Sequence, residues 1–279
     1  MWSREDVGLG QRACIVLKFG GELLERPEDV HRMAAGVRAL AARAALVVVH
    51  GGGKEIDAGL AAAGIAKRQV DGLRVTDEAT LGVVVSVLAG TINVRLVSAL
   101  RQAGGRAVGL TGIDAGVATM KRAKPILSTA GDTVDLGLVG TPSRSAGPDL
   151  LLDLVKRGYV PIVSCLGATA KGQVLNVNAD TLASHLAVGM GASRLVIAGG
   201  TPGVLDGEGR PIARLTVKDA ARLVKDGTAN KGMVAKLQAC RDAIRGGVGD
   251  VVIGNGRTLR FARLADRSAA QPNSTQVVR

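Results

Sequence analysis

Short apolar runs rich in β-branched residues recur along the chain, and glycine follows each of them closely. Residues 15–17 precede the motif KFGG at 18–21, and residues 46–49 precede the motif HGGG at 50–53. The remaining runs of this kind lie at 107–110, 160–163, 195–198 and 251–253. Runs of this length and composition, ended by glycine, predict buried β-strands.

Longer stretches with helical periodicity separate these runs. They lie at 29–45, 55–63, 78–103, 179–190, 217–225 and 233–245. Strands that alternate with helices predict an α/β fold with a mainly parallel sheet. In such a sheet, ligands bind beyond the carboxyl ends of the strands, which is where the glycine clusters of this chain fall.

Three segments need a separate interpretation. Residues 121–148 are basic and then rich in Gly, Ser and Thr, and we expect a β-hairpin at 134–139. A second run of strand and helix starts at Tyr159, which predicts a boundary between two lobes near 168–175. The segment after Leu264 is polar, so we expect it to be loosely held.

The composition narrows the class of protein. Apolar residues make up 47% and aromatic residues only 1%, so the core must be aliphatic. The formal net charge of +12 would suit a nucleic-acid partner, but the basic residues are scattered and stacking aromatics are almost absent. We therefore expect no nucleic-acid partner, and we interpret the charge as a solvated surface that attracts anions.

The sequence gives no signal for export, for membrane insertion or for a zinc site. No apolar run reaches the length of about 18 residues that a membrane span needs, and residues 1–12 lack the apolar stretch of a secretory signal. Cys14, Cys165 and Cys240 are far apart in the sequence and share no ligand spacing with the three histidines. We expect a cytoplasmic protein with free thiols, no membrane anchor and no metal held by the protein alone.

Two glycine-rich motifs are candidates for phosphate binding. In KFGG, a lysine at a strand end and two glycines would let an ammonium group and backbone N–H groups approach a phosphate together. The spacing is neither that of a P-loop nor that of a Rossmann fingerprint. In HGGG, three consecutive glycines exceed what a turn needs, which favours close approach of a ligand to the backbone. His50 is interpreted as a packed or hydrogen-bonded residue rather than a catalyst.

The motif GLRVTD at 72–77 opens a long predicted helix. Thr76 or Asp77 suits the N-cap of that helix, and capping is a sufficient explanation for both. Arg74 is not explained by capping. Its planar guanidinium group suits a carboxylate ligand.

The motifs NVNADT at 176–181 and KGMVAK at 231–236 leave alternatives open. Asn178 or Asp180 could be a helix cap, but the first motif holds more polar groups than one cap needs. Lys236 could simply lie on an exposed helix face.

Taken together and in this order, the motifs resemble those of the amino acid kinase family, and most closely those of its acetylglutamate kinases. The matching stretches are VLKFGGEL (16–23), VVVHGGGKEID (47–57), GLRVTD (72–77), AGTINVRL (89–96), AVGLTGID (107–114), DLGLVGTP (135–142), GYVPIVSCLG (158–167), NVNADTL (176–182), TPGVLD (201–206) and KGMVAKLQA (231–239). Each stretch is weak alone, but their common order over about residues 14–257 is highly specific.

The resemblance implies a three-layer αβα sandwich around a mainly parallel sheet, in two lobes. Residues 13–172 would form the N-terminal lobe, which binds the amino acid substrate and makes the contact of a homodimer. Residues 173–263 would form the C-terminal lobe, which binds ATP, and residues 264–279 a polar tail.

The resemblance also implies a reaction, in which ATP phosphorylates the side-chain carboxylate of N-acetyl-L-glutamate in the second step of arginine biosynthesis. Lys18 and Lys236 would flank the transferring phosphoryl group, and Asp180 would orient both lysines. Further residues would contact the substrate (Gly52, Gly53, Arg74, Asn176) and the nucleotide with its phosphates (Gly20, Gly21, Gly200, Thr201, Pro202, Gly203, Val204, Leu205, Thr228, Ala229, Asn230).

This chemistry agrees with the residue types that the motifs supply. A carboxylate nucleophile is already ionised at neutral pH, so no general base is needed. Catalysis then reduces to positioning and charge neutralisation by lysines, an arginine and backbone N–H groups. Mg²⁺ would be carried mainly by the ATP phosphates rather than by a protein cage.

Some features depart from the family pattern. Gly199-Gly200 stands where the family usually has Ser-Asp or Thr-Asp, which removes a charge and a hydroxyl beside the nucleotide. The chain ends in STQVVR, without the family's Gly-Thr ending. The residues before the first predicted strand are too few for the long helix of arginine-regulated hexameric relatives, so we expect a homodimer.

Two other functions stay open. A related kinase acts on aminoadipate or glutamate attached to a small acidic carrier protein, and a contiguous basic groove at the mouth of the substrate site would favour that function. A non-catalytic homologue that only binds a ligand would explain Gly199-Gly200, although the residues implied in phosphoryl transfer are all present.

Overall fold

The predicted apolar runs form the central sheet of the molecule. The computed structural model describes residues 12–128, 130–143, 147–229 and 231–279. Its largest sheet has eight strands, in the order β14 (Arg214–Thr216), β16 (Ser274–Val278), β15 (Asp250–Asn255), β13 (Arg194–Gly199), β1 (Cys14–Phe19), β2 (Ala45–His50), β10 (Val160–Ser164) and β5 (Ala107–Thr111). Neighbouring strands are parallel except for β15 and β16. The predicted α/β fold with a mainly parallel sheet is therefore confirmed.

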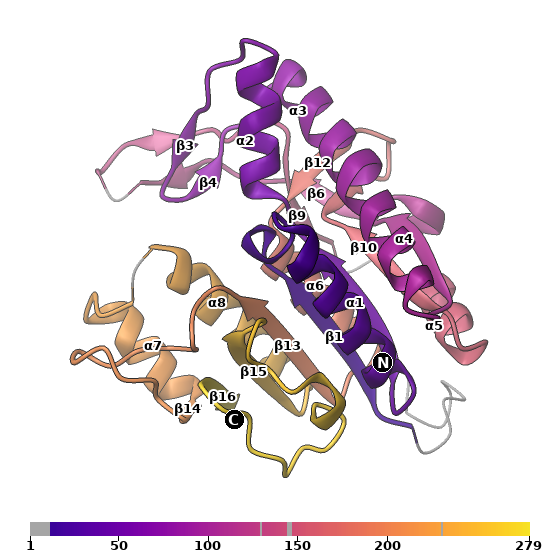
Figure 1. The fold of residues 1–279 in the computed structure, drawn as a ribbon. Helices are drawn as coiled ribbons and strands as arrows, with labels where there is room; N and C mark the ends of the chain where they lie inside the picture. Colours follow the sequence, from indigo (N-terminus) through magenta and orange to yellow (C-terminus); the bar gives the residue numbers. More distant parts are fainter. Residues whose placement is uncertain (1–11, 129, 144–146, 230) are drawn as a thin grey trace.

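Helices cover both faces of this sheet (Figure 1). On one face, α1 (Pro27–Ala41) packs against α4 (Asn93–Gln102), which also contacts β5 and β10. On the other face, α5 (Asp149–Lys156) packs on β2 and β10, α6 (Ala179–Gly189) on β1 and β13, and α8 (Lys231–Arg245) on α6 and β15. These contacts give the three layers that the sequence led us to expect. Strands β1, β2, β10 and β13 are buried along their whole length because aliphatic residues face helices on both sides.

Further helices and 3₁₀ turns join these elements. They are α2 (Gly53–Ala62), α7 (Val217–Lys225) and the 3₁₀ turns η1 (Gly21–Leu23), η3 (Asp114–Gly116) and η4 (Phe261–Arg263). Helix α7 begins at a capping box, in which Thr216 accepts from the N–H of Asp219 while the Asp219 carboxylate accepts from the N–H of Thr216.

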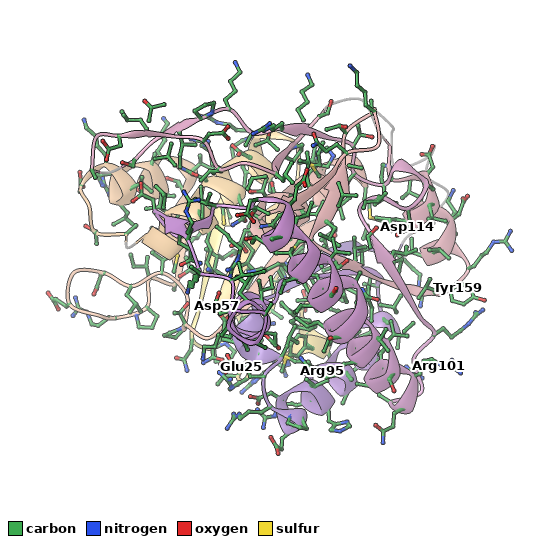
Figure 2. All side chains as sticks on the ribbon, turned by 90° about the horizontal axis from the view of Figure 1, so that it is seen from above. Glu25, Asp57, Arg95, Arg101, Asp114 and Tyr159 are labelled. Atoms are coloured by element: carbon green, nitrogen blue, oxygen red, sulfur yellow. The ribbon has the colours of Figure 1, made fainter. Side chains whose placement is uncertain are left out.

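The long predicted helix at 78–103 is continuous in the structure. It consists of α3 (Glu78–Val85), a π-helical segment η2 (Ser86–Ile92) and α4, and Arg95 and Arg101 project from its last part (Figure 2). Among the described residues, it is the one helix long and apolar enough to cross a membrane by length and composition. In this fold, however, it packs against α1, β5 and β10 as part of a layer.

A second, smaller sheet lies beyond the carboxyl end of the central one. Its strands follow the order β11 (Leu166–Ala168), β12 (Val174–Val177), β9 (Val139–Pro142) and β6 (Met120–Arg122), and two short ribbons accompany it, β3 (Gln69–Val70) with β4 (Leu73–Arg74) and β7 (Ile126–Leu127) with β8 (Thr133–Val134). The hairpin expected at 134–139 is wrong, because β8 pairs with β7 and β9 pairs with β6 and β12. The residues between β8 and β9 instead bind Thr76, whose N–H donates to Leu136 and whose carbonyl accepts from Leu138.

The expectation of a loosely held tail is also wrong. The last strand, β16, lies inside the central sheet between β14 and β15. Thr275 and Val277 are fully buried, whereas their neighbours are only partly buried. This alternation is the period of a half-buried strand, and the polar composition of the segment concealed it.

The parallel register brings the predicted glycine motifs together. Lys18 is aligned with Val49 of β2 on one side and with Ile197 of β13 on the other. The segments that follow β1, β2 and β13 therefore leave the sheet side by side at its carboxyl edge. This edge is the place where a ligand of such a sheet is expected.

Candidate active site

The two glycine motifs meet at Gly21 and Gly53, where the backbones lie so close that Gly21 has no room for a side chain. A Cβ atom on Gly21 would lie 2.9 Å from the backbone nitrogen of Gly53, and one on Gly52 would overlap the side chain of Ile92. A pocket of about 220 Å³ opens beside them. Its walls include the predicted residues Lys18, Gly20, Gly21, Gly52, Gly53, Arg74 and Asn176.

Three charged residues form a cluster at the carboxyl edge of the central sheet: Lys18, Asp180 and Lys236. The Nζ atom of Lys18 lies 2.8 Å from one carboxylate oxygen of Asp180, and the Nζ atom of Lys236 lies 3.9 Å from the other. Lys18 comes from the end of β1, Asp180 from the first turn of α6 and Lys236 from the middle of α8. Of these side chains, that of Lys236 is the most exposed, at 19%, against 8% for Lys18 and 7% for Asp180.

Lys18 and Asp180 keep their charges in spite of their burial. Burial alone would lower the pKa of Lys18, but attraction to Asp180, supported by Glu22, outweighs it and raises that pKa. Burial would likewise raise the pKa of Asp180, but the attraction of Lys18 and Lys236 lowers it. Lys18 and Asp180 therefore carry opposite charges at neutral pH, and Lys236 gives the cluster a formal excess of one positive charge, which suits the phosphates of a nucleotide.

The structure distinguishes the helix cap in the NVNADT motif from the carboxylate that pairs with the two lysines. The side-chain oxygen of Asn178 accepts from the N–H groups of Asp180 and Thr181, so Asn178 is the N-cap of α6. Asp180 is thereby free to pair with the two lysines. Asp77 caps α3 in the same way by accepting from the N–H of Thr80, 2.8 Å away.

Arg74 lies in the wall of the pocket with part of its guanidinium group unpaired. Its side chain is only 7% exposed, and its Nη2 atom pairs with Asp57 of α2 (Figure 2 labels Asp57). Its Nη1 atom is buried and has no hydrogen-bond partner among the described residues. A buried donor without a partner is costly, so this nitrogen favours an anionic ligand in the pocket. Asn176 lines the same pocket and donates to the hydroxyl of Thr76, 3.1 Å away.

The backbone donors of the site differ from those expected. The N–H of Gly20 donates to the carbonyl of Ala198 at 2.8 Å, so this N–H is not available to a ligand. Helix α2 begins at Gly53 and directs the N–H groups of its first turn, and the positive end of its dipole, toward the pocket side of the glycine motif. The HGGG motif is thus the better anion cradle of the two.

His50 is a packed residue, as the sequence analysis predicted. It is fully buried, and its Nδ1 atom lies 3.2 Å from the carbonyl oxygen of Gly51. The amide of Asn93 donates to its Nε2 atom at 3.2 Å, so a neutral ring protonated on Nδ1 satisfies both contacts. Burial, with a contribution from Arg95, lowers the pKa of His50 to about 4. The ring therefore stays neutral at physiological pH.

The predicted nucleotide residues lie in two segments. Residues 200–205 leave the carboxyl end of β13, next to the KFGG motif. Gly203 has a φ of +99° and packs against Thr275, whose hydroxyl accepts from the N–H of Val204. Thr228 and Ala229 lie shortly before α8, which begins at Lys231, whereas Asn230 lies outside the described residues.

Several pocket residues were not predicted from the sequence. Glu22, Ile56, Gln69, Leu73, Val139, Cys165 and Ala179 also line the pocket. Glu22 follows the two glycines of KFGG directly, which is the one signal that could have identified it. Burial raises the pKa of Cys165 to about 12, so its thiol is protonated at neutral pH and is a poor nucleophile. The pocket can therefore bind and orient anions, and its chemistry is electrostatic.

Comparisons with known proteins agree with this geometry. The profile of the amino acid kinase family matches residues 13–255. An acetylglutamate kinase of Parvibaculum lavamentivorans is 40% identical over 261 residues, which cover 91% of this chain and 85% of that protein. An acetylglutamate kinase of Methanopyrus kandleri is 41% identical over 243 residues, which cover 86% of this chain and 94% of that protein.

A solved structure shares the fold over nearly the whole chain. It is the N-acetylglutamate synthase of Neisseria gonorrhoeae complexed with coenzyme A and N-acetyl-glutamate, with a TM-score of 0.79 and 25% identity. The similarity covers 96% of this chain but only 59% of the synthase, so the chain spans about three fifths of that protein. The profile match and the identity to the two kinases, each over most of the chain, assign the protein to a family of phosphotransferases. The chain belongs to the amino acid kinase family.

Proposed function

We propose that the protein transfers the γ-phosphoryl group of ATP to the side-chain carboxylate of N-acetyl-L-glutamate. The observation that carries this proposal is the buried, unpaired Nη1 atom of Arg74, in the wall of a pocket that Lys18, the ion-pair partner of Asp180, also lines. A dicarboxylate fits such a pocket, because one carboxylate can bind the arginine while the other lies near the lysine. The relatives named acetylglutamate kinase support the same substrate.

The residues of the site would act by positioning and by charge. Arg74 and Asn176 would hold the carboxylate that does not react. The first turn of α2, with Gly52 and Gly53, would donate N–H groups to the reacting carboxylate and to the transferring phosphoryl group. Lys18 and Lys236 would neutralise the charge that spreads over the phosphoryl oxygens in the transition state, held by Asp180. Because the attacking carboxylate is already ionised, no side chain needs to remove a proton.

The nucleotide would lie on the side of the C-terminal half of the chain. We assign the amino acid substrate to a lobe of residues 13–172 and ATP to a lobe of residues 173–263, with Gly21 and residues 200–205, Thr228 and Ala229 beside the nucleotide. Mg²⁺ would enter with the phosphates. Mg²⁺ usually keeps several waters and is bound by one or two carboxylates together with substrate phosphates. Among the described residues, no group of three or more His, Cys, Asp or Glu side chains could hold a metal ion.

The activity can be measured as acyl phosphate trapped with hydroxylamine in the presence of ATP, Mg²⁺ and N-acetyl-L-glutamate. We expect turnover with this substrate, and we expect Arg74→Ala to raise KM for it by about 10–100-fold, since a hydrogen bond to a charged group contributes roughly 1.5–3 kcal/mol. Arg101→Ala is the matched control, because Arg101 is an exposed arginine of α4 outside the pocket. Unchanged KM in Arg74→Ala, with normal turnover, would remove Arg74 from the substrate site.

One observation supports testing the alternative that the substrate is attached to a carrier protein. A second hollow of about 880 Å³ shares Leu73, Val139 and Asn178 with the substrate pocket, and it has Lys121, Arg122 and Lys124 on its wall. A basic groove at this place is what an acidic carrier protein would need. The names of the relatives favour the free substrate. ATP binding without turnover of N-acetyl-L-glutamate would contradict our proposal and would favour the carrier-linked substrate or a non-catalytic role.

We also propose that the protein works as a cytoplasmic homodimer. The exposed face of the long helix α3–η2–α4 supports a contact there, because Val94 is 62% exposed and only 39% of the most apolar window of the helix is buried. Burying such a face against a second copy would remove apolar surface from water. Light scattering after size exclusion should give twice the chain mass of 28.4 kDa. A mass equal to that of one chain would contradict the dimer.

A further inference from the structure

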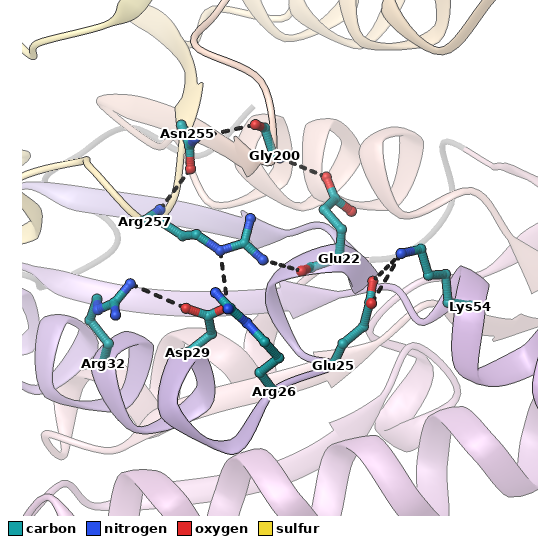
Figure 3. A network of polar contacts seen from close by, with 9 residues as sticks. All are labelled: Glu22, Glu25, Arg26, Asp29, Arg32, Lys54, Gly200, Asn255 and Arg257. Carbon is teal, nitrogen blue, oxygen red and sulfur yellow. Dashed lines mark hydrogen bonds and ion pairs between the residues drawn. The ribbon is translucent and has the colours of Figure 1, made fainter.

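Glu22 places a carboxylate between the carboxyl ends of β1 and β13. Its Oε1 atom accepts from the N–H of Gly200 at 2.8 Å (Figure 3). A Cβ atom on Gly199 would lie 2.9 Å from the same oxygen, and one on Gly20 would overlap the carboxylate. Gly20, Gly199 and Gly200 therefore leave room for this one side chain. The pair Gly199-Gly200, which departs from the family pattern, therefore helps to make room for the Glu22 side chain.

The backbone of Glu22 is held by a polar network around the buried carboxylate of Asp29. Arg257 donates from Nη2 to the carbonyl oxygen of Glu22 at 2.8 Å and from Nε to Asp29 at 2.9 Å (Figure 3). The carboxylate of Asp29, only 1% exposed, also pairs with Arg26 and Arg32. Asn255 donates to the carbonyl oxygen of Gly200 at 3.2 Å. Hydrogen bonds therefore hold both the backbone of Glu22 and the Gly200 segment that its carboxylate contacts, so Glu22 does not lie in a free surface loop.

The charge of Glu22 is unusual for a position next to a phosphate site. Glu22 lines the pocket with Lys18 and the glycine motifs. Among the described residues, no lysine or arginine nitrogen forms an ion pair with its carboxylate within 4.0 Å. Bound triphosphate would bring several negative charges to this edge of the sheet, and two sets of anions repel each other at short range. A divalent cation between them would convert this repulsion into attraction.

We propose that Glu22 is a ligand, direct or through water, of the divalent cation that accompanies the nucleotide. Mg²⁺ prefers oxygen ligands and is commonly bound by one or two carboxylates together with substrate phosphates and water. A single glutamate over a cradle of glycines fits this requirement, whereas the described residues offer no cage that could hold the ion alone. The assignment rests on the proposed function, because it needs a nucleotide beside Glu22.

Nucleotide binding measured by calorimetry tests this role without turnover. The probe is AMP-PNP, with Mg²⁺ or with EDTA, and the readout is the ratio of the two dissociation constants. We expect Mg²⁺ to tighten binding to the wild type, and Glu22→Gln to reduce that gain at least tenfold. The same variant should bind metal-free AMP-PNP as well as or better than the wild type, because a negative charge beside the phosphates is gone. Glu22→Asp, which keeps the charge at a shorter reach, should retain part of the gain.

Glu25→Gln is the matched control. Glu25 follows in the same loop region, and its carboxylate pairs with Lys54 at 3.0 Å near the surface (Figure 3). We expect this variant to keep the wild-type ratio.

Two outcomes would overturn the assignment of Glu22. If Glu22→Gln tightened binding equally with and without Mg²⁺, or left both constants unchanged, Glu22 would not be a cation ligand. If the wild type failed to bind AMP-PNP under both conditions, the proposed kinase function would fail, and the role of Glu22 with it.

Mn²⁺ in place of Mg²⁺ gives an independent readout, since the electron paramagnetic resonance signal of free Mn²⁺ is lost on binding. We expect the ternary complex of Glu22→Gln to retain less Mn²⁺ than that of the wild type.

Discussion

Replacing Lys18 by alanine is expected to lower kcat by about 10²–10³-fold, which corresponds to about 3–4 kcal/mol of transition-state stabilisation. The ammonium group of Lys18 is buried and paired with Asp180 at 2.8 Å, so its charge acts with little screening by water. The substitution also leaves the buried Asp180 carboxylate with Lys236 as its one remaining cation in the cluster, 3.9 Å away. The pKa of Asp180 should rise in this variant, because the attraction of Lys18 is a main reason that it is low in the wild type.

Single-turnover kinetics with saturating ATP and N-acetyl-L-glutamate should separate the chemical step from binding. Lys156→Ala is the matched control, because Lys156 is an exposed lysine in the last turn of α5, away from the pocket. Lys18→Arg keeps the charge but not the compact shape of an ammonium group, and we expect it to recover only part of the loss. A fall in kcat of less than tenfold in Lys18→Ala, with an intact fold, would remove Lys18 from the transition state.

The central sheet could be predicted from the sequence because its strands carry strong local signals. In β1, β2, β13 and β15 an uninterrupted aliphatic run is followed by glycine, and a parallel strand buried on both faces requires such a run. Lys18, at the end of β1, stood out because two glycines follow it closely in the motif KFGG. A lysine at the end of a buried strand is costly unless it is paired, and the structure supplies that partner in Asp180.

The elements that were missed depend on long-range pairing. Strand β16 is a short polar segment that becomes a strand because β14 and β15 supply partners on both sides. The residues between β8 and β9 are held by Thr76, far away in the sequence, rather than by a local hairpin. Neither pairing leaves a pattern in the segment itself that a reading of local periodicity could detect.

In the site, too, the sequence could indicate residue types, whereas their contacts could be found only in the structure. The sequence could nominate both Asn178 and Asp180, but only the structure shows that Asn178 caps α6 while Asp180 pairs with Lys18. It could propose Arg74 as a carboxylate ligand, but the unpaired Nη1 atom is visible only in three dimensions. Glu22 was passed over because its meaning depends on Gly200, which lies on another strand end.

A buried ion pair explains how the C-terminal segment is tied to β13 and β15 of the central sheet. Arg194 of β13 donates from Nε and Nη2 to the two carboxylate oxygens of Asp250 of β15, at 2.9 and 2.7 Å. Both side chains are almost completely buried. The Nη1 atom of Arg194 donates to the carbonyl oxygens of Leu264 and Asp266, and Gln276 of β16 donates to Asp250. The guanidinium group of Arg194 therefore links β13, β15 and the segment that leads to β16.

Asp250→Ala is expected to lower the free energy of unfolding by about 3–5 kcal/mol, because it leaves the Arg194 charge buried without its carboxylate. Urea unfolding followed by circular dichroism should show this loss as a lower midpoint. Glu208→Ala is the control, since the pair Glu208–Arg210 is about 70% exposed on both sides and should contribute less than about 1 kcal/mol.

The double variant Arg194→Met/Asp250→Leu separates the cost of an unpaired charge from the strength of the pair. We expect it to be more stable than Asp250→Ala, because no charge remains buried and the apolar side chains refill part of the volume. The carbonyl oxygens of Leu264 and Asp266 would still lose their donor, so the double variant should not reach the wild type. If the double variant were as unstable as Asp250→Ala, the lost carbonyl contacts would dominate, and the guanidinium group would act mainly as an anchor for the C-terminal segment.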